Sequence, residues 1–156
     1  MTNEQVPESR AYRHSKCGAE TVVSGESFSA VSNPLADMTR TWCTSCNAFF
    51  PVSEYVWDDT GEKLVDYYNR HSTRATAFDR FLCSRLFLIV SVVIGALVGV
   101  AVGYALTRNG ALGQRLLASG FLAFVGIFAA AALNVSVISK VIVKRVCGVA
   151  DTRTLK

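Results

Sequence analysis

The stretches LFLIVSVVIGALVGVAVGYALT (residues 86–107) and LLASGFLAFVGIFAAAALNVSVIS (residues 116–139) decide the fold of this chain, because neither contains a charged residue or a histidine. They are 22 and 24 residues long. An α-helix rises about 1.5 Å per residue, so about 20 apolar residues cross a bilayer core of roughly 30 Å. Only residues 108–115 separate the two stretches, which suits a tight turn. The sequence therefore predicts a two-helix transmembrane hairpin over residues 86–139.

Charge is distributed unevenly along this chain of net charge +4. Residues 1–80 carry 8 Lys/Arg and 11 Asp/Glu, giving −3, whereas residues 81–156 carry 8 and 1, giving +7. The positive charge thus flanks the apolar stretches, as insertion into a lipid bilayer favours, and it does not indicate nucleic-acid binding. The connecting loop holds only Arg108 and Arg115, so the positive-inside rule predicts an integral membrane protein with both termini in the cytoplasm. The polar N-terminal residues lack the apolar core of a secretory signal peptide, and we expect the first apolar stretch to act as a signal anchor.

Four candidate metal ligands precede the apolar stretches, in the motifs His14-Ser-Lys-Cys17 and Cys43-Thr-Ser-Cys46. Two residues separate the ligands of each pair, a spacing that places both donors on one side of a tetrahedral ion. The residues after the two motifs are Gly18 and Asn47, which tolerate the positive φ of a tight turn and so let backbone N–H groups approach the sulfurs. Three thiolates and one imidazole favour zinc.

This pattern resembles the zinc-ribbon class of small β modules. In these modules, two turns that each carry a pair of ligands, called knuckles, lie on facing hairpins. The resemblance covers residues 12–57, and it departs from the usual four cysteines because His14 stands in the place of the first. It implies a structural zinc ion held by four protein ligands, with no position open to water. If His14 were not a ligand, the site would be open, and Glu20 and Asp37 would become the acidic residues of interest.

The fold class predicted for the whole chain is an α+β membrane protein with a small zinc-bound β-rich domain, an interfacial amphipathic helix and a two-helix transmembrane hairpin. Short β-type runs at residues 20–23, 28–31, 39–42 and 48–52 alternate with turn residues. The predicted segments are a disordered tail (1–11), a zinc-ribbon-like cytoplasmic domain (12–58), an amphipathic juxtamembrane helix (59–85), the transmembrane hairpin (86–139) and a basic cytoplasmic tail (140–156).

Two features of the first half of the chain each have two interpretations. Residues 59–85 show apolar positions three and four apart, with a polar step at residues 71–73 that can divide the helix. The apolar face of this segment lies either in the membrane interface or against the small domain. Aromatic residues around the second knuckle form either the small core or an exposed patch that docks a partner; they are Trp42, Phe49, Phe50, Tyr55 and Trp57.

Small residues recur every four positions in both apolar stretches, which is typical of close helix contacts in membranes. Counting outward from the loop places Gly103 opposite about Gly120, and Gly99 opposite about residues 123–124. The contact either closes the hairpin on itself or joins the chain to a second copy or to another membrane protein. Asn134 is strongly polar and needs a partner in a helix interface. The predicted packing residues are Gly95, Gly99, Gly103, Gly126, Ala130 and Asn134.

No catalytic constellation stands out, so the chain is not predicted to be an enzyme. The features favour a membrane-anchored, zinc-binding interaction protein whose partner is an unidentified membrane or cytoplasmic protein. One alternative is a homo-oligomeric channel or transporter accessory whose helices pack through the glycines. Neither apolar stretch, however, contains a row of charged residues that could line a transport path. Another is a membrane-bound thiol redox protein that uses Cys43 and Cys46.

Overall fold

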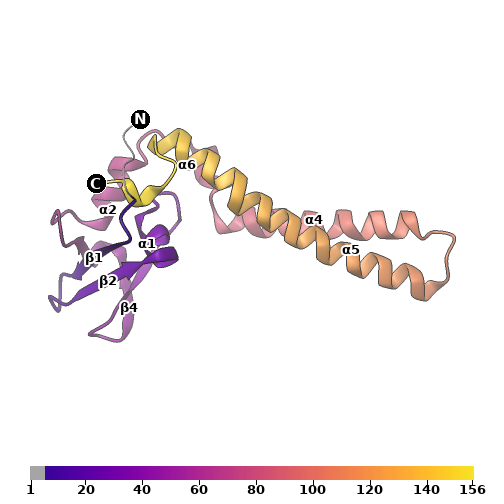
Figure 1. The fold of residues 1–156 in the computed structure, drawn as a ribbon, viewed down its shortest axis with the longest axis horizontal. Helices are drawn as coiled ribbons and strands as arrows, with labels where there is room; N and C mark the ends of the chain where they lie inside the picture. The colour runs from indigo at the N-terminus through magenta and orange to yellow at the C-terminus, as the bar shows by residue number, and fades with distance from the viewer. Residues whose placement is uncertain (1–5) are drawn as a thin grey trace. The chain divides into compact units, whose positions relative to one another are not determined.

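The structure is a computed structural model that describes residues 6–156. The chain forms two compact units. The first unit contains the residues up to Arg80 together with Val141–Lys156, and the second is Phe81–Lys140. Small β-sheets and two long apolar helices give a mixed α+β protein, as the sequence predicts (Figure 1).

The regular elements follow one another along the chain in a fixed order. They are β1 (Ser9–His14), β2 (Glu20–Ser24), α1 (Gly25–Ser32), β3 (Arg40–Cys43), β4 (Ala48–Pro51), the 3₁₀ turn η1 (Val52–Glu54), β5 (Tyr55–Trp57), α2 (Leu64–His71), α3 (Ala77–Leu82), α4 (Arg85–Leu106), α5 (Leu112–Leu133), the π-helical turn η2 (Asn134–Ile138), α6 (Ser139–Cys147) and the 3₁₀ turn η3 (Thr152–Thr154).

Two antiparallel hairpins position the candidate ligands in the first unit. β1 pairs with β2, with Arg13 opposite Glu20, and its other edge pairs with β5, so that the strand order is β2-β1-β5. The second sheet is the hairpin β3–β4, with Cys43 opposite Ala48. One ligand motif lies at the turn of each hairpin.

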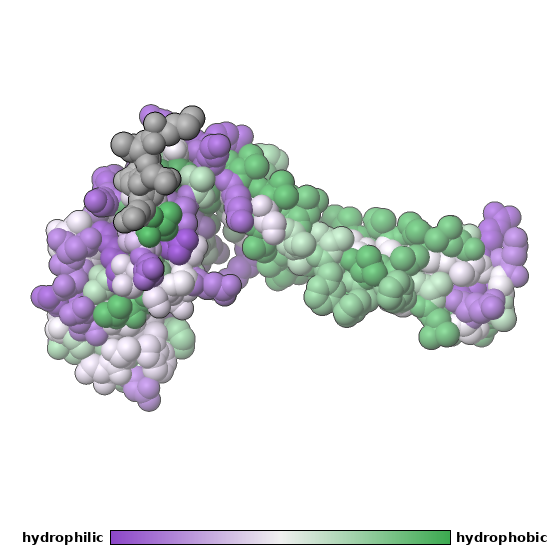
Figure 2. Space-filling model, in the orientation of Figure 1, coloured by the Kyte–Doolittle hydropathy of each residue, from purple (hydrophilic) through white to green (hydrophobic). Residues whose placement is uncertain are grey.

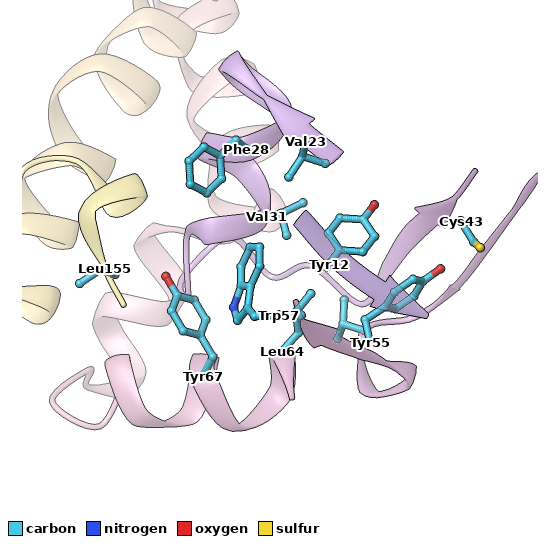
Figure 3. Packing of buried hydrophobic residues seen from close by; sticks show 11 residues of the cluster. Tyr12, Val23, Phe28, Val31, Cys43, Tyr55, Trp57, Leu64, Tyr67 and Leu155 are labelled. Atoms are coloured by element: carbon cyan, nitrogen blue, oxygen red, sulfur yellow. The ribbon is translucent and has the colours of Figure 1, made fainter. Parts of the chain in front are cut away.

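An aromatic cluster forms the core of the first unit (Figure 3). The rings of Tyr12 and Tyr55 meet edge to face with their centroids 5.1 Å apart, and those of Trp57 and Tyr67 do so at 5.6 Å. The buried hydroxyl group of Tyr12 donates a hydrogen bond to the carbonyl of Trp42 at 2.7 Å. Large aromatic side chains give a domain of this size much of its buried apolar area.

The predicted aromatic core divides into a buried and an exposed group. Tyr55 and Trp57 are fully buried in the core cluster, and Phe50 packs against it. Phe49 is 57% exposed, and its ring packs against half-buried Trp42 with centroids 5.0 Å apart. Part of the set therefore fits the core interpretation, and the other part forms an aromatic pair on the surface.

Residues 28–31, which the sequence predicts as a β-type run, instead belong to the helix α1. Gly25 begins this helix with a φ of +54°, which glycine adopts without strain. Phe28, Val31 and Ser32 are buried, at the spacing of one helix face. A short apolar run does not distinguish a strand from a buried helix turn, and here packing against the core decides the outcome.

The segment predicted as an amphipathic helix over residues 59–85 divides into α2 and α3 at its polar step. α2 buries Leu64 and Tyr67 in the core, which corresponds to the interpretation that this face packs on the small domain. The backbone carbonyl of buried Ser72 accepts a hydrogen bond from Arg80 at 3.2 Å, which satisfies a polar group at the break.

The C-terminal segment differs from the predicted basic tail, because much of it packs within the first unit. α6 buries Ile142, Val143 and Val146, while its charged residues remain exposed. Leu155 joins the core cluster, and the hydroxyl groups of Thr152 and Ser32 lie 3.1 Å apart. The apolar residues between the charged ones thus cause this segment to pack within the first unit.

The predicted N-terminal tail over residues 1–11 differs from the structure in its last part. Residues 1–5 lie outside the described residues. Ser9 and the residues after it form the central strand β1.

The second unit is an antiparallel pair of helices, α4 and α5, which are long and apolar enough to cross a membrane. Figure 2 shows hydrophobic residues over their visible face and hydrophilic residues at the loop that joins them. Glycines allow the close contact: a Cβ atom added to Gly103 would lie 2.6 Å from the Cα of Ser119, and one added to Gly99 would lie 2.7 Å from the amide nitrogen of Ala123. These partners lie within about one residue of the positions counted from the loop.

The other predicted packing residues lie further along the same contact. A Cβ atom added to Gly95 would meet the backbone of Gly126 and the side chain of Ala130. Asn134 begins the π-helical turn η2 and is only 6% exposed. Its amide nitrogen makes no hydrogen bond within the described chain.

Candidate metal centre

The four predicted ligands come together at the tips of the two hairpins. His14 ends β1 and Cys43 ends β3, while Cys17 and Cys46 lie in the turns that follow. One ligand atom from each of the four lies within 4.8 Å of the others, close enough to hold a metal ion. No other group of three or more histidine, cysteine or acidic residues in the described part of the chain has this arrangement.

The distances between the donor atoms fit a tetrahedral ion. With Zn–S bonds of about 2.3 Å, two ligand atoms of a tetrahedron lie about 3.8 Å apart. The Sγ atoms of Cys17 and Cys43 are 3.7 Å apart, and the Sγ of Cys46 is 3.8 Å from Nδ1 of His14. The Sγ of Cys17 is 3.2 Å from the same nitrogen, somewhat closer than this edge. Three of the six distances between the donors are thus near this edge, and all six are within 4.8 Å.

Glu54 holds the His14 imidazole in the orientation that a ligand needs. Nε2 of His14 lies 3.1 Å from Oε2 of Glu54, while Nδ1 lies beside the sulfurs of Cys17 and Cys46. A carboxylate that accepts a hydrogen bond from one ring N–H leaves the lone pair of the other ring nitrogen available to a metal. The ring is also stacked, with the Phe50 and Tyr55 centroids 4.5 and 4.9 Å away.

Glu54 also fixes the backbone and the charge of the first knuckle. Its carbonyl oxygen accepts a hydrogen bond from the Ser15 amide at 2.8 Å, and its carboxylate pairs with Lys16 at 2.8 Å. The hydrogen bonds from Lys16 and His14 lower the pKa of the Glu54 carboxyl. The carboxylate is therefore charged at neutral pH and remains a hydrogen-bond acceptor.

The backbone of both knuckles has the conformation that the sequence predicts. Gly18 has a φ of +70° and Asn47 a φ of +51°. The amide of Gly18 donates to the carbonyl of His14 at 2.8 Å and closes the first turn. A hydrogen bond from the Ala19 amide then lowers the pKa of the Cys17 thiol to about 7. The turn thus stabilises the thiolate form that a metal requires.

The close approach of the sulfurs has the opposite effect on Cys46. Its thiol donates hydrogen bonds to the sulfurs of Cys17 and Cys43, which raises the pKa of Cys46 to about 12. Three thiolates this close repel one another, and a divalent cation among them removes that repulsion. The cluster is therefore suited to a cation.

The arrangement suits a structural role for the ion. His14 and Cys43 are buried at 1% and 0% exposure, whereas Cys17 and Cys46 lie at the surface. Four protein donors are the number that a closed structural zinc site requires. Glu20 and Asp37, the alternative acidic candidates, are not part of the cluster.

Sequence analysis did not find Glu54. This residue lies 40 positions from His14 and belongs to no spacing motif. It reaches the imidazole because β5, which begins directly after it, pairs with β1 with Tyr55 opposite His14. Only a prediction that β5 pairs with β1 could have identified Glu54 from the sequence.

Comparison with known proteins gives no relative for this chain: no family model, no curated protein and no solved structure matches it.

Proposed function

We propose that this protein is a membrane-anchored interaction protein whose small domain is stabilised by a structural zinc ion. The observation that carries the proposal is the convergence of His14, Cys17, Cys43 and Cys46 on one point, in a chain that also carries two helices apolar enough to cross a membrane. The proposed zinc site is of the ribbon type, with one knuckle on each hairpin. The protein is not an enzyme in this proposal.

Zinc is the metal that these donors favour. Three sulfurs and one imidazole nitrogen are soft and borderline ligands, which select against magnesium and calcium. The ion connects the hairpins β1–β2 and β3–β4, which belong to separate sheets. A small domain with two short sheets gains much of its stability from such a connection.

The helices α4 and α5 are the proposed anchor. Most of their large apolar side chains are exposed, including Leu97 at 63% and Phe121 at 66%. A lipid bilayer provides the surroundings that such side chains require. The positive-inside rule places both termini in the cytoplasm, so the zinc domain lies on that side of the membrane.

The surface aromatic pair supports an interaction role for the zinc domain. Trp42 and Phe49 line a groove of about 450 Å³ whose other walls come from α1 and the edge strand β2. Val22 on that strand is 64% exposed. Exposed aromatic and apolar side chains beside an edge strand are typical of surfaces that receive a partner protein.

The alternatives of a homo-oligomer and a thiol redox protein make different demands on the same residues. The glycines at positions 95, 99 and 103 already contact α5 within the hairpin, so a homo-oligomer would need another helix face. A redox pair would react at once with an alkylating reagent. Zinc-bound thiolates resist mild alkylation until a chelator is added.

The experiment compares the full chain in detergent with the variants Cys43→Ser and Cys83→Ser. We expect one zinc ion per chain in the wild type and in Cys83→Ser, whose sulfur lies outside the cluster, and loss of zinc and of the near-UV circular dichroism of the domain in Cys43→Ser. Cross-linking in native membranes then tests the interaction role, with a partner recovered by the wild type and by Cys83→Ser and lost with Cys43→Ser. Metal-free wild type with freely reactive thiols would refute the zinc centre, and recovery of self-complexes alone would refute the interaction role.

A further inference from the structure

A second site lies in the first unit, away from the metal cluster. A pocket of about 410 Å³ opens between the start of α3 and the helix α6. Its wall combines cationic, hydroxyl and apolar side chains, and its lining residues are Arg74, Thr76, Phe78, Asp79, Arg145 and Val146.

Asp79 is the one acidic residue of this pocket, and its carboxylate is fully occupied. Oδ1 accepts a hydrogen bond from Arg145. Oδ2 accepts from the amide of Thr76 at 3.0 Å and from its hydroxyl at 2.9 Å. The Asp79 side chain is only 3% exposed, so it lies beneath the pocket and orients Arg145 rather than facing a ligand.

The two arginines leave the pocket with an excess of positive charge. The side chain of Arg74 makes no hydrogen bond or ion pair within residues 6–156, so all its donors are free. Arg145 uses one nitrogen on Asp79, and its side chain remains 63% exposed. Two guanidinium groups on one pocket match the oxygen atoms of a phosphate group.

We propose that this pocket binds the phosphate group of an anionic phospholipid. Free phosphate has the same charge chemistry, but two observations favour the lipid. Phe78 is a pocket residue that is 64% exposed, and an apolar side chain at the rim suits an acyl chain rather than a free ion. The second observation is the position of the pocket residues in the sequence.

The pocket residues lie next to both proposed membrane spans in the sequence. Asp79 comes a few residues before α4 begins at Arg85, and Arg145 a few residues after η2 ends at Ile138. In the sequence, residues this close to the ends of two membrane spans are within reach of the headgroup level. Basic pockets at this level recognise anionic headgroups. The inference rests on the proposed anchoring in a membrane and is independent of zinc.

The experiment measures lipid binding to the full chain in detergent micelles by native mass spectrometry. The probes are dioctanoyl phosphatidylglycerol and dioctanoyl phosphatidylcholine, which share a phosphodiester and differ in net charge. The test variant is Arg74→Gln, which disturbs no ion pair. The matched control is Lys144→Gln, which removes the same charge from an exposed position of α6 outside the pocket.

We expect one phosphatidylglycerol to bind the wild type in preference to phosphatidylcholine. Arg74→Gln weakens this binding by about tenfold, as for a lost charge-assisted hydrogen bond, and Lys144→Gln does not change it. Equal binding by Arg74→Gln and wild type would overturn the proposal, and so would an equal loss in Lys144→Gln, which would indicate diffuse attraction. Binding of inorganic phosphate as tight as that of phosphatidylglycerol, in the same measurement, would assign the pocket to a free anion and overturn the lipid proposal. Unchanged zinc content and circular dichroism in Arg74→Gln separate this result from any failure of the zinc centre.

Discussion

The imidazole of His14 faces in two directions: Nε2 lies 3.1 Å from Oε2 of Glu54, and Nδ1 lies 3.2 Å from Sγ of Cys17. An Nε2–H group that donates to this carboxylate leaves the lone pair of Nδ1 directed at the sulfur cluster. Glu54 therefore orients His14 in the candidate metal centre, although it is not one of the four candidate ligands.

Glu54→Gln should weaken zinc binding by about 10- to 100-fold, because a neutral amide orients the imidazole less firmly and makes it less basic. The measurement is competition with a chromophoric chelator at neutral pH. Glu20→Gln is the matched control, since Glu20 lies on the neighbouring strand β2 and outside the cluster, and it should bind zinc as the wild type does. Equal affinities for Glu54→Gln and wild type would show that His14 does not depend on this contact.

The glycine contact of the hairpin gives a second prediction. A Cβ atom at Gly99 would meet the backbone of Leu122 and Ala123, whereas one at Gly120 would meet nothing within 4 Å. Gly99→Leu should therefore destabilise the protein by about 1–3 kcal/mol or more, since this is the usual cost of an overpacked contact. Gly120→Leu is the control and should not destabilise the protein in this way. Thermal unfolding in detergent measures the difference. Similar melting temperatures for the two variants would argue against the close contact.

Sequence analysis could predict features that depend on local spacing. The uncharged runs and the turn that joins them determine which residues of α4 and α5 face each other, because a helix has a fixed rise and the loop fixes the origin of the count. The two ligand motifs are equally local, and Gly18 and Asn47 adopt the positive φ expected of them.

Features that depend on packing between distant segments could not be predicted in this way. Phe28 and Val31 form a helix face because the aromatic core lies beside them, and no period is visible in so short a run. Glu54 reaches His14 only through the pairing of β5 with β1. Leu155 enters the core after the chain has passed through both apolar helices, and no local signal marks that return.

The C-terminal segment should contribute directly to the stability of the first unit. Leu155 is 7% exposed and lies in the aromatic cluster, so Leu155→Ala should cost about 2 kcal/mol or more. Val141→Ala is the control, because Val141 is 61% exposed in α6. Chemical unfolding monitored by tryptophan fluorescence reports on Trp57 in this cluster. A stability of Leu155→Ala equal to that of the control would mean that the segment does not pack there in solution.

The ion pair between Glu62 and Arg70 predicts a pH dependence. Arg70 donates two hydrogen bonds, of 2.9 and 2.7 Å, to the Glu62 carboxylate and lowers its pKa from 4.5. A pKa that is lower in the folded state means that the pair stabilises the fold fully above about pH 4.5 and that this contribution is lost as the pH falls below that value. The pair is partly exposed, so its contribution at neutral pH is below about 1 kcal/mol.

Glu62→Gln should accordingly be slightly less stable than the wild type at neutral pH, and the difference should disappear in acid. The measurement is a set of denaturant titrations across this pH range, with the wild type as reference at each pH so that effects of metal release cancel. A difference that stays constant with pH would mean that the carboxylate charge is not its source.

X-ray absorption at the zinc edge of the purified full chain tests the central claim most directly. The account predicts one zinc ion per chain with three sulfur neighbours at about 2.3 Å and one nitrogen neighbour at about 2.0–2.1 Å. The imidazole signal should be lost in His14→Ala, while the three sulfurs remain. A chain purified without zinc, or a wild-type spectrum with fewer than three sulfurs, would contradict the proposed metal centre.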